Sequence, residues 1–333
     1  MTITSIQHFD TERPALLALD WGTSSLRAFL LDPRGEVAMQ REAAWGIQQL
    51  PSPAAVGGFD HAFEAIAGDW VSRWPHLPVV ACGMVGSAQG WREAPYVPCP
   101  ANLTTLSSHL VQVTSRLGAH IHIAPGLVLT SQRTPTGHDI LPDVMRGEEI
   151  QMLGALSHQP AWAERVCMVL PGTHSKWAWI EAGTVRHFMT SMTGELFAVL
   201  RQHSILGRLM PTSGMSTHPH VFERGVKLGY QAAPGKLITL LFSARSMALT
   251  GELKTDALPD YLSGLLIGSE LAAALRDPDL VPDGPLVLLG AQGLTQRYMQ
   301  ALVAVGLTPT AALDNPAPQG LWQVALTAGL ITP

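Results

Sequence analysis

A carboxylate and a cluster of hydroxyl groups stand between two apolar runs near the start of the chain. The segment reads Asp20-Trp-Gly-Thr-Ser-Ser and joins the apolar runs 15–20 and 26–31. A tight turn that contains glycine directs N–H and hydroxyl groups into a concavity where an anion such as phosphate can bind. A carboxylate beside it suits Mg²⁺, which takes one or two protein carboxylates and keeps most of its waters. The segment therefore predicts Asp20 as a magnesium ligand and these phosphate contacts: Gly22, Thr23, Ser24 and Ser25.

The same pattern returns at the start of the second half of the chain. Residues 166–190 again read as strand, Gly-Thr turn, strand, glycine turn and strand, and the Gly-Thr pair recurs 150 residues after the first. Leu170 stands where the first copy has Asp20, so only the first turn has a carboxylate for a metal ion at this position. This agrees with the binding of a single Mg²⁺. Ordinary surface turns are the alternative, with Asp20 capping a backbone N–H group and Lys176 in solvent. The second set of predicted phosphate contacts is Gly172, Thr173, His174, Ser175 and Lys176.

Hydrophobic periodicity divides each half of the chain into strands and helices. Helices are expected over 58–73, over 103–117 with Asn102 as N-cap, from about 143 to 156, and over 235–249, 259–276 and 320–331. Strands are expected at 15–20, 26–31, 36–42, 120–129, 286–289 and 307–313. Residues 78–87 read as a short strand that runs into a glycine-rich loop, and 166–190 as three strands joined by turns. Alternation of strands with helices predicts an α/β fold in each half. A duplication at half the chain length indicates two related domains, 1–160 and 161–333, with a boundary near 157–165.

Composition narrows the class of protein and its partners. The chain has 333 residues, of which 47% are apolar and 14% charged, so it can bury a large core. A net charge of −5 without a Lys/Arg run predicts no nucleic-acid partner. No apolar run reaches the ~18 residues of a membrane span, and the first residues do not form a signal peptide, so we expect a cytoplasmic protein. Three cysteines at unrelated spacings predict no disulfide framework.

Motifs connect the paired turns to a known superfamily. The sequence has neither a P-loop nor a dinucleotide fingerprint. Duplicated hairpins with Asp-x-Gly-Thr in the first and Gly-Thr in the second resemble those of sugar kinases, heat-shock chaperone ATPases and actin. More narrowly, DWGTSSLRAFLLD, ACGMVGSAQGW, DVMRGEEIQMLGAL and LPGTHSKWAWIEAG, within residues 20–183, are similar to the 2-dehydro-3-deoxygalactonokinase family.

The resemblance implies both a fold and a reaction. The implied fold is a pair of duplicated ribonuclease H-like, actin-like ATPase domains around an interdomain cleft. The implied reaction uses ATP and Mg²⁺ to phosphorylate the 6-hydroxyl of 2-dehydro-3-deoxy-D-galactonate in galactonate catabolism. In this superfamily a strand that ends in small residues before a helix holds adenosine, because a flat base can approach the backbone there. The matching residues are Gly290, Ala291 and Gln292.

The resemblance also implies where the acceptor is activated. Related kinases carry the catalytic carboxylate at the start of a helix after the last strand of the first domain, a position that fits Asp143, Glu148 or Glu149. A simple N-cap is the alternative for Asp143. Arg146 is the best nearby cation for a substrate carboxylate, because its planar fork matches one bidentately; a solvated helix face is its alternative. The loop GMVGSAQGW corresponds to the sugar side in the resembled family, unless it is an ordinary glycine-rich connection. Its predicted substrate contacts are Ser87, Gln89 and Trp91.

Other functions stay open from the sequence. Another sugar acid, such as 2-dehydro-3-deoxygluconate, is an alternative acceptor. RGEEIQMLG also resembles the helix of exopolyphosphatase-type phosphohydrolases, which would need no sugar. A non-catalytic nucleotide-binding regulator is disfavoured because the first strand begins near residue 15 and leaves no room for a helix-turn-helix before it. The expected partner is a small sugar acid, and a homodimer is conceivable.

Overall fold

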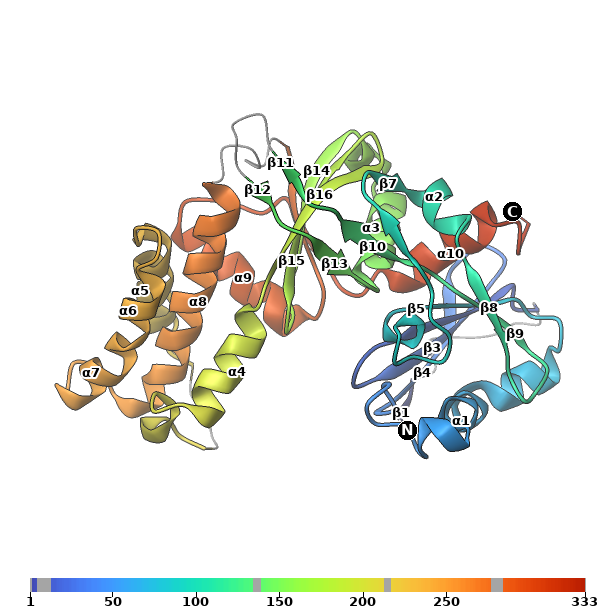
Figure 1. The fold of residues 1–333 in the computed structure, drawn as a ribbon, viewed down its shortest axis with the longest axis horizontal. Helices are drawn as coiled ribbons and strands as arrows, with labels where there is room; N and C mark the ends of the chain where they lie inside the picture. The colour runs from blue at the N-terminus through green and yellow to red at the C-terminus, as the bar shows by residue number, and fades with distance from the viewer. Residues whose placement is uncertain (1, 5–12, 134–138, 213–216, 277–283, 333) are drawn as a thin grey trace. The chain divides into compact units, whose positions relative to one another are not determined.

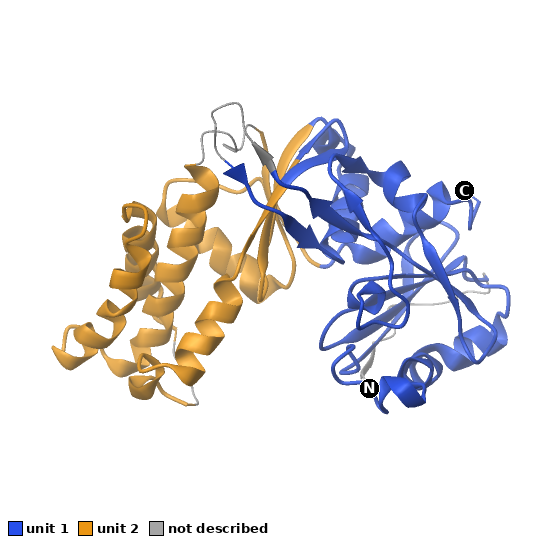
Figure 2. Ribbon diagram, viewed as in Figure 1, with its two compact units in different colours: residues 1–164, 180–187, 315–333 blue, residues 165–179, 188–314 orange. Residues whose placement is uncertain are grey.

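The chain forms two compact units (Figure 2). The structure, a computed structural model, describes residues 2–4, 13–133, 139–212, 217–276 and 284–332. Unit 1 comprises 1–164, 180–187 and 315–333, and unit 2 comprises 165–179 and 188–314. The predicted domains 1–160 and 161–333 were continuous, whereas unit 1 also takes in residues 180–187 and the end of the chain. The end of the chain belongs to unit 1 because its last helix, Ala317–Thr327, packs closely on the helix Glu148–His158.

A seven-stranded sheet forms the base of unit 1 (Figure 1). Its first three long strands are consecutive and antiparallel, and the next two are parallel to the first of these. The strand order is β1-β4-β3-β2-β5-β9-β8. The bounds are β1 Thr2–Thr4, β2 Leu16–Trp21, β3 Leu26–Leu31, β4 Val37–Ala43, β5 Val79–Cys82, β8 Val111–Thr114 and β9 His120–Ile123.

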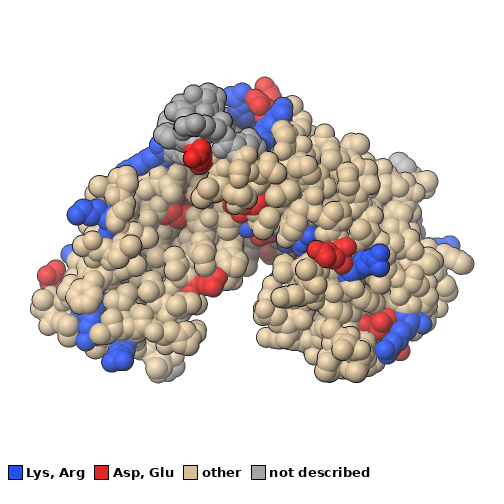
Figure 3. Space-filling view, viewed as in Figure 1, with Lys and Arg blue, Asp and Glu red and all other residues tan. Residues whose placement is uncertain are grey.

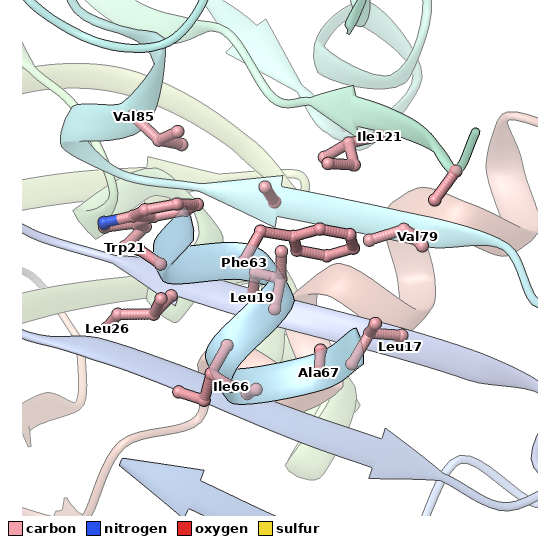
Figure 4. Close-up of a cluster of buried hydrophobic side chains, with 14 of the residues drawn as sticks. Leu17, Leu19, Trp21, Leu26, Phe63, Ile66, Ala67, Val79, Val85 and Ile121 are labelled. Carbon is pink, nitrogen blue, oxygen red and sulfur yellow. The ribbon is translucent and has the colours of Figure 1, made fainter. Parts of the chain in front are cut away.

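Helix α1 (Gly58–Arg73) covers this sheet with the apolar face that its sequence predicts. Phe63 and Ile66 are fully buried and lie over Leu17 and Leu19 of β2 (Figure 4). Burial of one such side chain contributes about 1.5–3 kcal/mol. The core therefore holds β2 in place up to its last residues, where Asp20 stands.

The other elements of unit 1 are short. A three-stranded sheet has the order β13-β10-β6, and β11 pairs with β12. Their bounds are β6 Tyr96–Pro98, β10 Gly126–Leu129, β11 Gln132–Arg133, β12 Asp139–Ile140 and β13 Asp143–Met145. The helices are α2 Leu103–Ser107, α3 Glu148–His158 and α10 Ala317–Thr327, with 3-10 turns at Ala54–Val56, Met84–Gly86 and Pro160–Ala163. Helix α10 lies so close to α3 that a Cβ at Gly320 would overlap the Ile150 carbonyl oxygen.

Two predicted elements of unit 1 are wrong in extent. The predicted helix 103–117 ends at Ser107, although Asn102 caps it as expected by accepting from the Thr105 N–H at 3.0 Å. Val111 and Val113 alternate with exposed polar residues and so satisfy the two-residue period of a strand, which becomes β8. The predicted strand 120–129 is two strands, β9 and β10, in different sheets.

The strands of unit 2 belong to a second, six-stranded sheet with the order β18-β17-β14-β15-β16-β7, of which β7 and residues 180–187 are part of unit 1. With β7 left out here, and β1 and β8 left out of the first sheet, the remaining five strands of each sheet can be numbered in chain order. Both sheets then have the order third, second, first, fourth and fifth: β16-β15-β14-β17-β18 here and β4-β3-β2-β5-β9 in the first sheet. Strand β14 is parallel to β17, and β17 to β18. The bounds are β7 Ala101–Asn102, β14 Arg165–Leu170, β15 Ser175–Glu181, β16 Thr184–Ser191, β17 Leu286–Leu289 and β18 Ala311–Leu313.

Helices make up most of the remainder of unit 2. Their bounds are α4 Thr193–His203, α5 Pro219–Gln231, α6 Leu237–Leu241, α7 Ser243–Leu249, α8 Leu258–Leu275 and α9 Gln292–Ala304, with 3-10 turns at Gly207–Leu209 and Thr255–Ala257. The predicted helix 235–249 is wrong as one element, because it breaks at Phe242. The Ser243 hydroxyl donates to the Leu240 carbonyl at 2.5 Å and so competes for a backbone acceptor at the break.

The distribution of charged side chains and the length of apolar helices are relevant to which partners the protein can have. On the face that Figure 3 shows, basic and acidic side chains are scattered and interspersed. Among the described residues, no helix combines the length and the apolar character needed to cross a bilayer. Cys82, Cys99 and Cys167 are buried and free.

Helices α5 and α8 approach each other through paired glycines. A Cβ at Gly264 of α8 would overlap the Phe222 carbonyl of α5, and one at Gly225 of α5 would overlap the Tyr261 carbonyl of α8. Gly268 and Gly229 repeat this one turn further along. The core of unit 2 therefore depends on two backbones that pack without side chains between them.

We predict that Gly264→Ala destabilises the protein by about 2 kcal/mol or more, since the added methyl must push two helices apart. The free energy of unfolding in urea measures this. Gly293→Ala is the matched control: Gly293 is also helical, but a Cβ there meets nothing within 4 Å, so the change should be neutral or stabilising. Equal stability of the two variants would contradict the close packing.

Candidate active site

Asp20 is held near the end of β2 by neighbours on both sides. It pairs in register with Arg27 of β3 and Cys82 of β5, and its side chain is 17% exposed. Its Oδ2 atom lies 3.5 Å from Arg27 Nη1 and accepts a hydrogen bond from Asn315 Nδ2 at 3.3 Å. Burial raises the pKa of Asp20, while Arg27 and Asn315 oppose the rise. One carboxylate oxygen is thus fixed by protein groups, which orients the other.

The first turn, residues 22–25, is closed and supported from behind. The Gly22 N–H donates to the Ser25 carbonyl at 2.9 Å, and Thr23 and Ser24 are exposed at its tip. The N–H groups of residues 47 and 48 donate to the carbonyls of Gly22 and Thr23 at 3.1 and 3.2 Å. A Cβ at Gly46 would overlap Thr23, so only glycine allows this support.

The second turn, residues 172–176, is supported in the same way. Thr173 and His174 are exposed, and the Thr173 carbonyl accepts from the Glu195 N–H at 2.9 Å. A Cβ at Gly194 would lie 2.8 Å from the Thr173 Cα. In both halves a glycine after the third strand therefore backs the turn. Sequence reasoning missed Gly46 and Gly194, although they follow the turn glycines by a similar interval.

Two predicted phosphate contacts of the second turn have side chains with partners inside the protein. Ser175 is fully buried, and its hydroxyl donates to Glu270 at 2.7 Å. Lys176 is 6% exposed, and its Nζ donates to the Thr190 hydroxyl at 2.6 Å. Exposed groups of this turn come from Thr173 and His174, and His174 Nε2 lies 2.5 Å from a Glu195 carboxylate oxygen.

The start of α3 brings two glutamates to the end of β5. A Cβ at Gly147, whose φ is +109°, would lie 3.2 Å from the Gly83 Cα, so the helix begins in contact with the residue that follows β5. The Gly147 N–H donates to both Glu149 carboxylate oxygens at 2.8 Å, and the Arg146 N–H donates to Glu148 at 3.1 Å. Burial, followed by the charge of Glu148, raises the pKa of Glu149 to about 8.

Three carboxylates converge on one buried thiol. The pKa of Cys82 is raised well above its usual value, first by burial and then by the charges of Asp20, Glu149 and Glu148. These three predicted site residues therefore share one neighbourhood in unit 1.

Asp143 does not occupy its predicted position at a helix start. It lies in β13, paired with Leu129 of β10, and its Oδ1 accepts from the Val144 N–H at 2.7 Å. The helix begins only at Glu148, because residues 143–145 are committed to the strand ladder and the positive φ of Gly147 separates strand from helix. The prediction of a helix from about residue 143, with Asp143 at its N-terminus, is wrong.

Arg146 and Ser87 carry buried polar atoms without partners. Arg146 is 8% exposed; its Nη2 donates to the Ala94 carbonyl at 2.9 Å, and its guanidinium carbon lies 4.3 Å from the Tyr96 ring centre. Within the described residues, Nε and Nη1 of Arg146 and the Ser87 hydroxyl have no hydrogen-bond partner. Such groups are rare in native structures and require an explanation, for which a bound anion is one candidate.

The other predicted contacts of this loop differ in setting. Gln89 is exposed. Trp91 is half-buried in an aromatic cluster, with ring centres 5.8 Å from Trp21, 5.9 Å from Phe59 and 6.0 Å from Phe63. It therefore supports the end of β2 from the core side, next to Asp20.

The predicted adenosine loop lies between β17 and α9. Gly290 has a φ of +131°, and its N–H donates to the Leu313 carbonyl at 2.9 Å. Ala291 and Gln292 are exposed, and the space where a Cβ of Gly293 would stand is open. The backbone is thus accessible to a flat ligand at this helix start.

Comparison with known proteins places the chain among the sugar kinases. A family model described as 2-keto-3-deoxy-galactonokinase matches residues 20–324. The chain belongs to the 2-keto-3-deoxy-galactonokinase family. The residues matched include every candidate site residue described above.

Named relatives and a solved structure agree over most of the chain. The probable 2-dehydro-3-deoxygalactonokinase DgoK1 of Rhizobium meliloti (strain 1021) is 38% identical over 87% of this chain and 89% of its own. The 2-dehydro-3-deoxygalactonokinase of Escherichia coli (strain K12) is 35% identical over 90% of this chain and 94% of its own. A crystal structure of a Sinorhizobium meliloti protein, titled as a 2-dehydro-3-deoxygalactonokinase, superposes with a TM-score of 0.78 and is 35% identical in sequence. The match covers 93% of this chain and 98% of that one.

We predict that Glu149 makes stability fall as pH rises. Its folded-state pKa of about 8 exceeds the ordinary 4.5, so the folded protein holds the proton more tightly than the unfolded chain does. This stabilisation is complete below pH about 4.5 and is lost as pH rises through about 8. Each pKa unit is worth about 1.4 kcal/mol, so a few kcal/mol are at stake.

The measurement is the free energy of unfolding in urea across that pH range. Glu149→Gln keeps a neutral side chain of similar shape and should flatten the pH dependence. Glu64→Gln, at an exposed position of α1, is the control and should leave the wild-type slope. An unchanged slope in Glu149→Gln would show that Glu149 is not the group responsible.

Proposed function

We propose that this protein is an ATP-dependent kinase that phosphorylates the 6-hydroxyl of 2-dehydro-3-deoxy-D-galactonate. The observation that carries the proposal is the meeting of β2, β5 and the start of α3, which brings Asp20, Glu148 and Glu149 to the end of β5. Membership of the family and the names of the relatives support the substrate. Arg146, which is buried next to Glu148 and has two side-chain nitrogens without partners among the described residues, supports an acidic substrate.

We also propose that the two sheets belong to duplicated ribonuclease H-like domains. The shared strand order supports this, as does the glycine that backs the Gly-Thr turn in each half. Chance similarity of two short motifs would not produce both. On this proposal the predicted domains 1–160 and 161–333 describe the repeat, while α10 has come to pack on the first copy.

The nucleotide is proposed to contact three segments. Exposed hydroxyl and backbone groups of the first turn (Thr23 and Ser24) and of the second turn (Thr173) suit phosphate oxygens, because N–H and hydroxyl groups in such turns form anion-binding concavities. Gly290 to Gln292 suit the adenosine moiety. Ser175 and Lys176 support the second turn from within, since their side chains already have protein partners.

Asp20 is the proposed protein ligand of Mg²⁺. Within the described residues no three His, Cys, Asp or Glu side chains are arranged to enclose a metal ion. A single carboxylate suits Mg²⁺, because proteins usually bind this ion through one or two carboxylates, with waters and substrate phosphates as its other ligands. When bound, Mg²⁺ would neutralise charge on the phosphates. Arg27 and Asn315 fix one oxygen of Asp20 and keep the side chain oriented.

Glu148 is the proposed base that orients the acceptor hydroxyl. It is half-buried, whereas Glu149 is 1% exposed, has a pKa of about 8 and is bound to the Gly147 N–H. In the step, O6 forms a bond to the γ-phosphorus, the bond from that phosphorus to the β,γ-bridging oxygen breaks, and ADP leaves. The O6 proton passes to Glu148. Little more than orientation is needed, because the transition state of phosphoryl transfer is loose.

The proposed reaction predicts ADP release that depends on the sugar acid. A coupled assay with ATP and a panel of 2-keto-3-deoxy sugar acids should give the highest kcat/KM with the galactonate derivative. Asp20→Asn should lower kcat by about a hundredfold or more, as loss of an electrostatic group at a transferring phosphoryl does. Asp69→Asn, which also removes a carboxylate paired with an arginine in unit 1, should keep activity. Phosphate release from polyphosphate without any sugar acid would instead indicate a phosphohydrolase.

Arg146 is the proposed partner of the substrate carboxylate, so Arg146→Lys should raise KM for the sugar acid. Loss of a bidentate charged hydrogen bond predicts about a tenfold to hundredfold increase. KM for ATP should stay within about twofold, because the change affects the acceptor alone. Arg92→Lys, at an exposed position after the same loop, is the control. Equal rises in both KM values would exclude this role.

A further inference from the structure

Glu270 of α8 is a buried carboxylate that the proposed mechanism does not use. It is 4% exposed and accepts four side-chain hydrogen bonds. Oε1 accepts from Ser175 Oγ at 2.7 Å and Trp177 Nε1 at 2.8 Å, and Oε2 accepts from Tyr298 OH at 2.7 Å and from Thr193 Oγ1. All five residues belong to unit 2. Within the described residues no cation pairs with Glu270, so these four donors alone offset its burial.

The donors lie on the segments that form the proposed nucleotide site of unit 2. Ser175 directly follows the exposed Thr173 and His174 of the second turn and is the first residue of β15. Thr193 begins α4, and the next residue, Gly194, packs against the turn, while the Glu195 N–H binds the Thr173 carbonyl. Glu270 thus fixes the turn directly through β15 and indirectly through the start of α4.

The fourth donor connects the same carboxylate to the adenosine side. Tyr298 is 2% exposed and lies on α9, the helix that begins directly after Gly290 and Ala291. Because a helix moves as a rigid element, anchoring Tyr298 to Glu270 restrains the start of α9 as well. One carboxylate therefore links the phosphate turn to the adenosine loop.

We propose that Glu270 is a positioning residue, which holds the second turn and the adenosine loop at the spacing that a bound nucleotide requires. The inference rests on the proposed function. A buried carboxylate without a cation is a poor source of stability, since an apolar group of the same volume is often at least as stabilising. A fully satisfied polar network does, however, fix one geometry. Glu270 acts on nucleotide affinity through the turn and α9, without touching the ligand.

The experiment removes single hydroxyls from the network. Tyr298→Phe cuts the connection to α9, and Thr193→Val cuts the connection to α4, while each keeps the side-chain volume nearly unchanged. Both should raise KM for ATP about tenfold, the scale expected when a positioning contact is lost, and leave KM for the sugar acid within about twofold. Thr193→Ser keeps the hydroxyl and should restore KM for ATP.

Tyr261→Phe is the matched control. Tyr261 is another buried tyrosine of unit 2, and its hydroxyl pairs with the Ser243 hydroxyl at 2.8 Å, outside the Glu270 network. It should lose similar stability but keep KM for ATP. If Tyr298→Phe and Thr193→Val match Tyr261→Phe in KM for ATP, or if both substrates are affected equally, the inference is overturned.

Calorimetric binding of a nonhydrolysable ATP analogue separates this inference from the proposed function. Wild-type protein that binds the analogue and phosphorylates the sugar acid, alongside network variants that bind the analogue as tightly, would overturn the inference alone. Wild-type protein that binds no nucleotide would overturn the proposed function and the inference with it. Weaker analogue binding in both network variants, with wild-type binding in Tyr261→Phe, is the result we expect.

Discussion

The close approach of three backbone segments at the end of β5 is the constraint on which the candidate site depends. A Cβ at Gly83 would lie 2.8 Å from the Trp21 carbonyl oxygen, and a Cβ at Gly147 would lie 3.2 Å from the Gly83 Cα. The ends of β2 and β5 and the start of α3 therefore meet without side chains between them. Asp20 and Glu148 lie on either side of this junction, so their separation is set by the backbone rather than by flexible side chains.

This junction concentrates negative charge, and the protein offsets the cost locally. Burial raises the pKa of both Asp20 and Glu149, which means that their charged forms are disfavoured. Arg27 and Asn315 counter this for Asp20, and the Gly147 N–H does so for Glu149. Because the compensation for Glu149 is incomplete, a proton near neutral pH resides on the buried glutamate, which lowers the repulsion felt by Glu148.

Local sequence could predict the elements whose chemistry is local. The strands around Asp20, helix α1 and both Gly-Thr turns follow from periodicity and turn chemistry within about thirty residues. The position of Asp143 was mistaken for the same reason: a polar residue before an apolar helical run is typical of an N-cap, and only the pairing of β13 with the distant β10 overrides it. Residues 103–117 failed similarly, since a stripe of Leu and Val suits a helix or a strand.

Contacts between distant segments were beyond this reasoning. Asn315 lies 295 residues from Asp20, and Glu270 lies 95 residues from Ser175. Neither has a motif, because an amide or a carboxylate acquires its role from what the fold brings beside it. Gly46 and Gly194 left a faint signal, as each follows a Gly-Thr turn at a similar interval, but a lone glycine after a strand has many other uses.

The two Gly-Thr turns differ in where a nearby carboxylate lies. Asp20 precedes the first turn and is partly exposed, while Leu170, at the corresponding place before the second turn, is buried. Behind the second turn lies the buried carboxylate of Glu270, which accepts from four side-chain donors. The first turn thus follows a partly exposed carboxylate, whereas the second follows a buried leucine and has its buried carboxylate behind it.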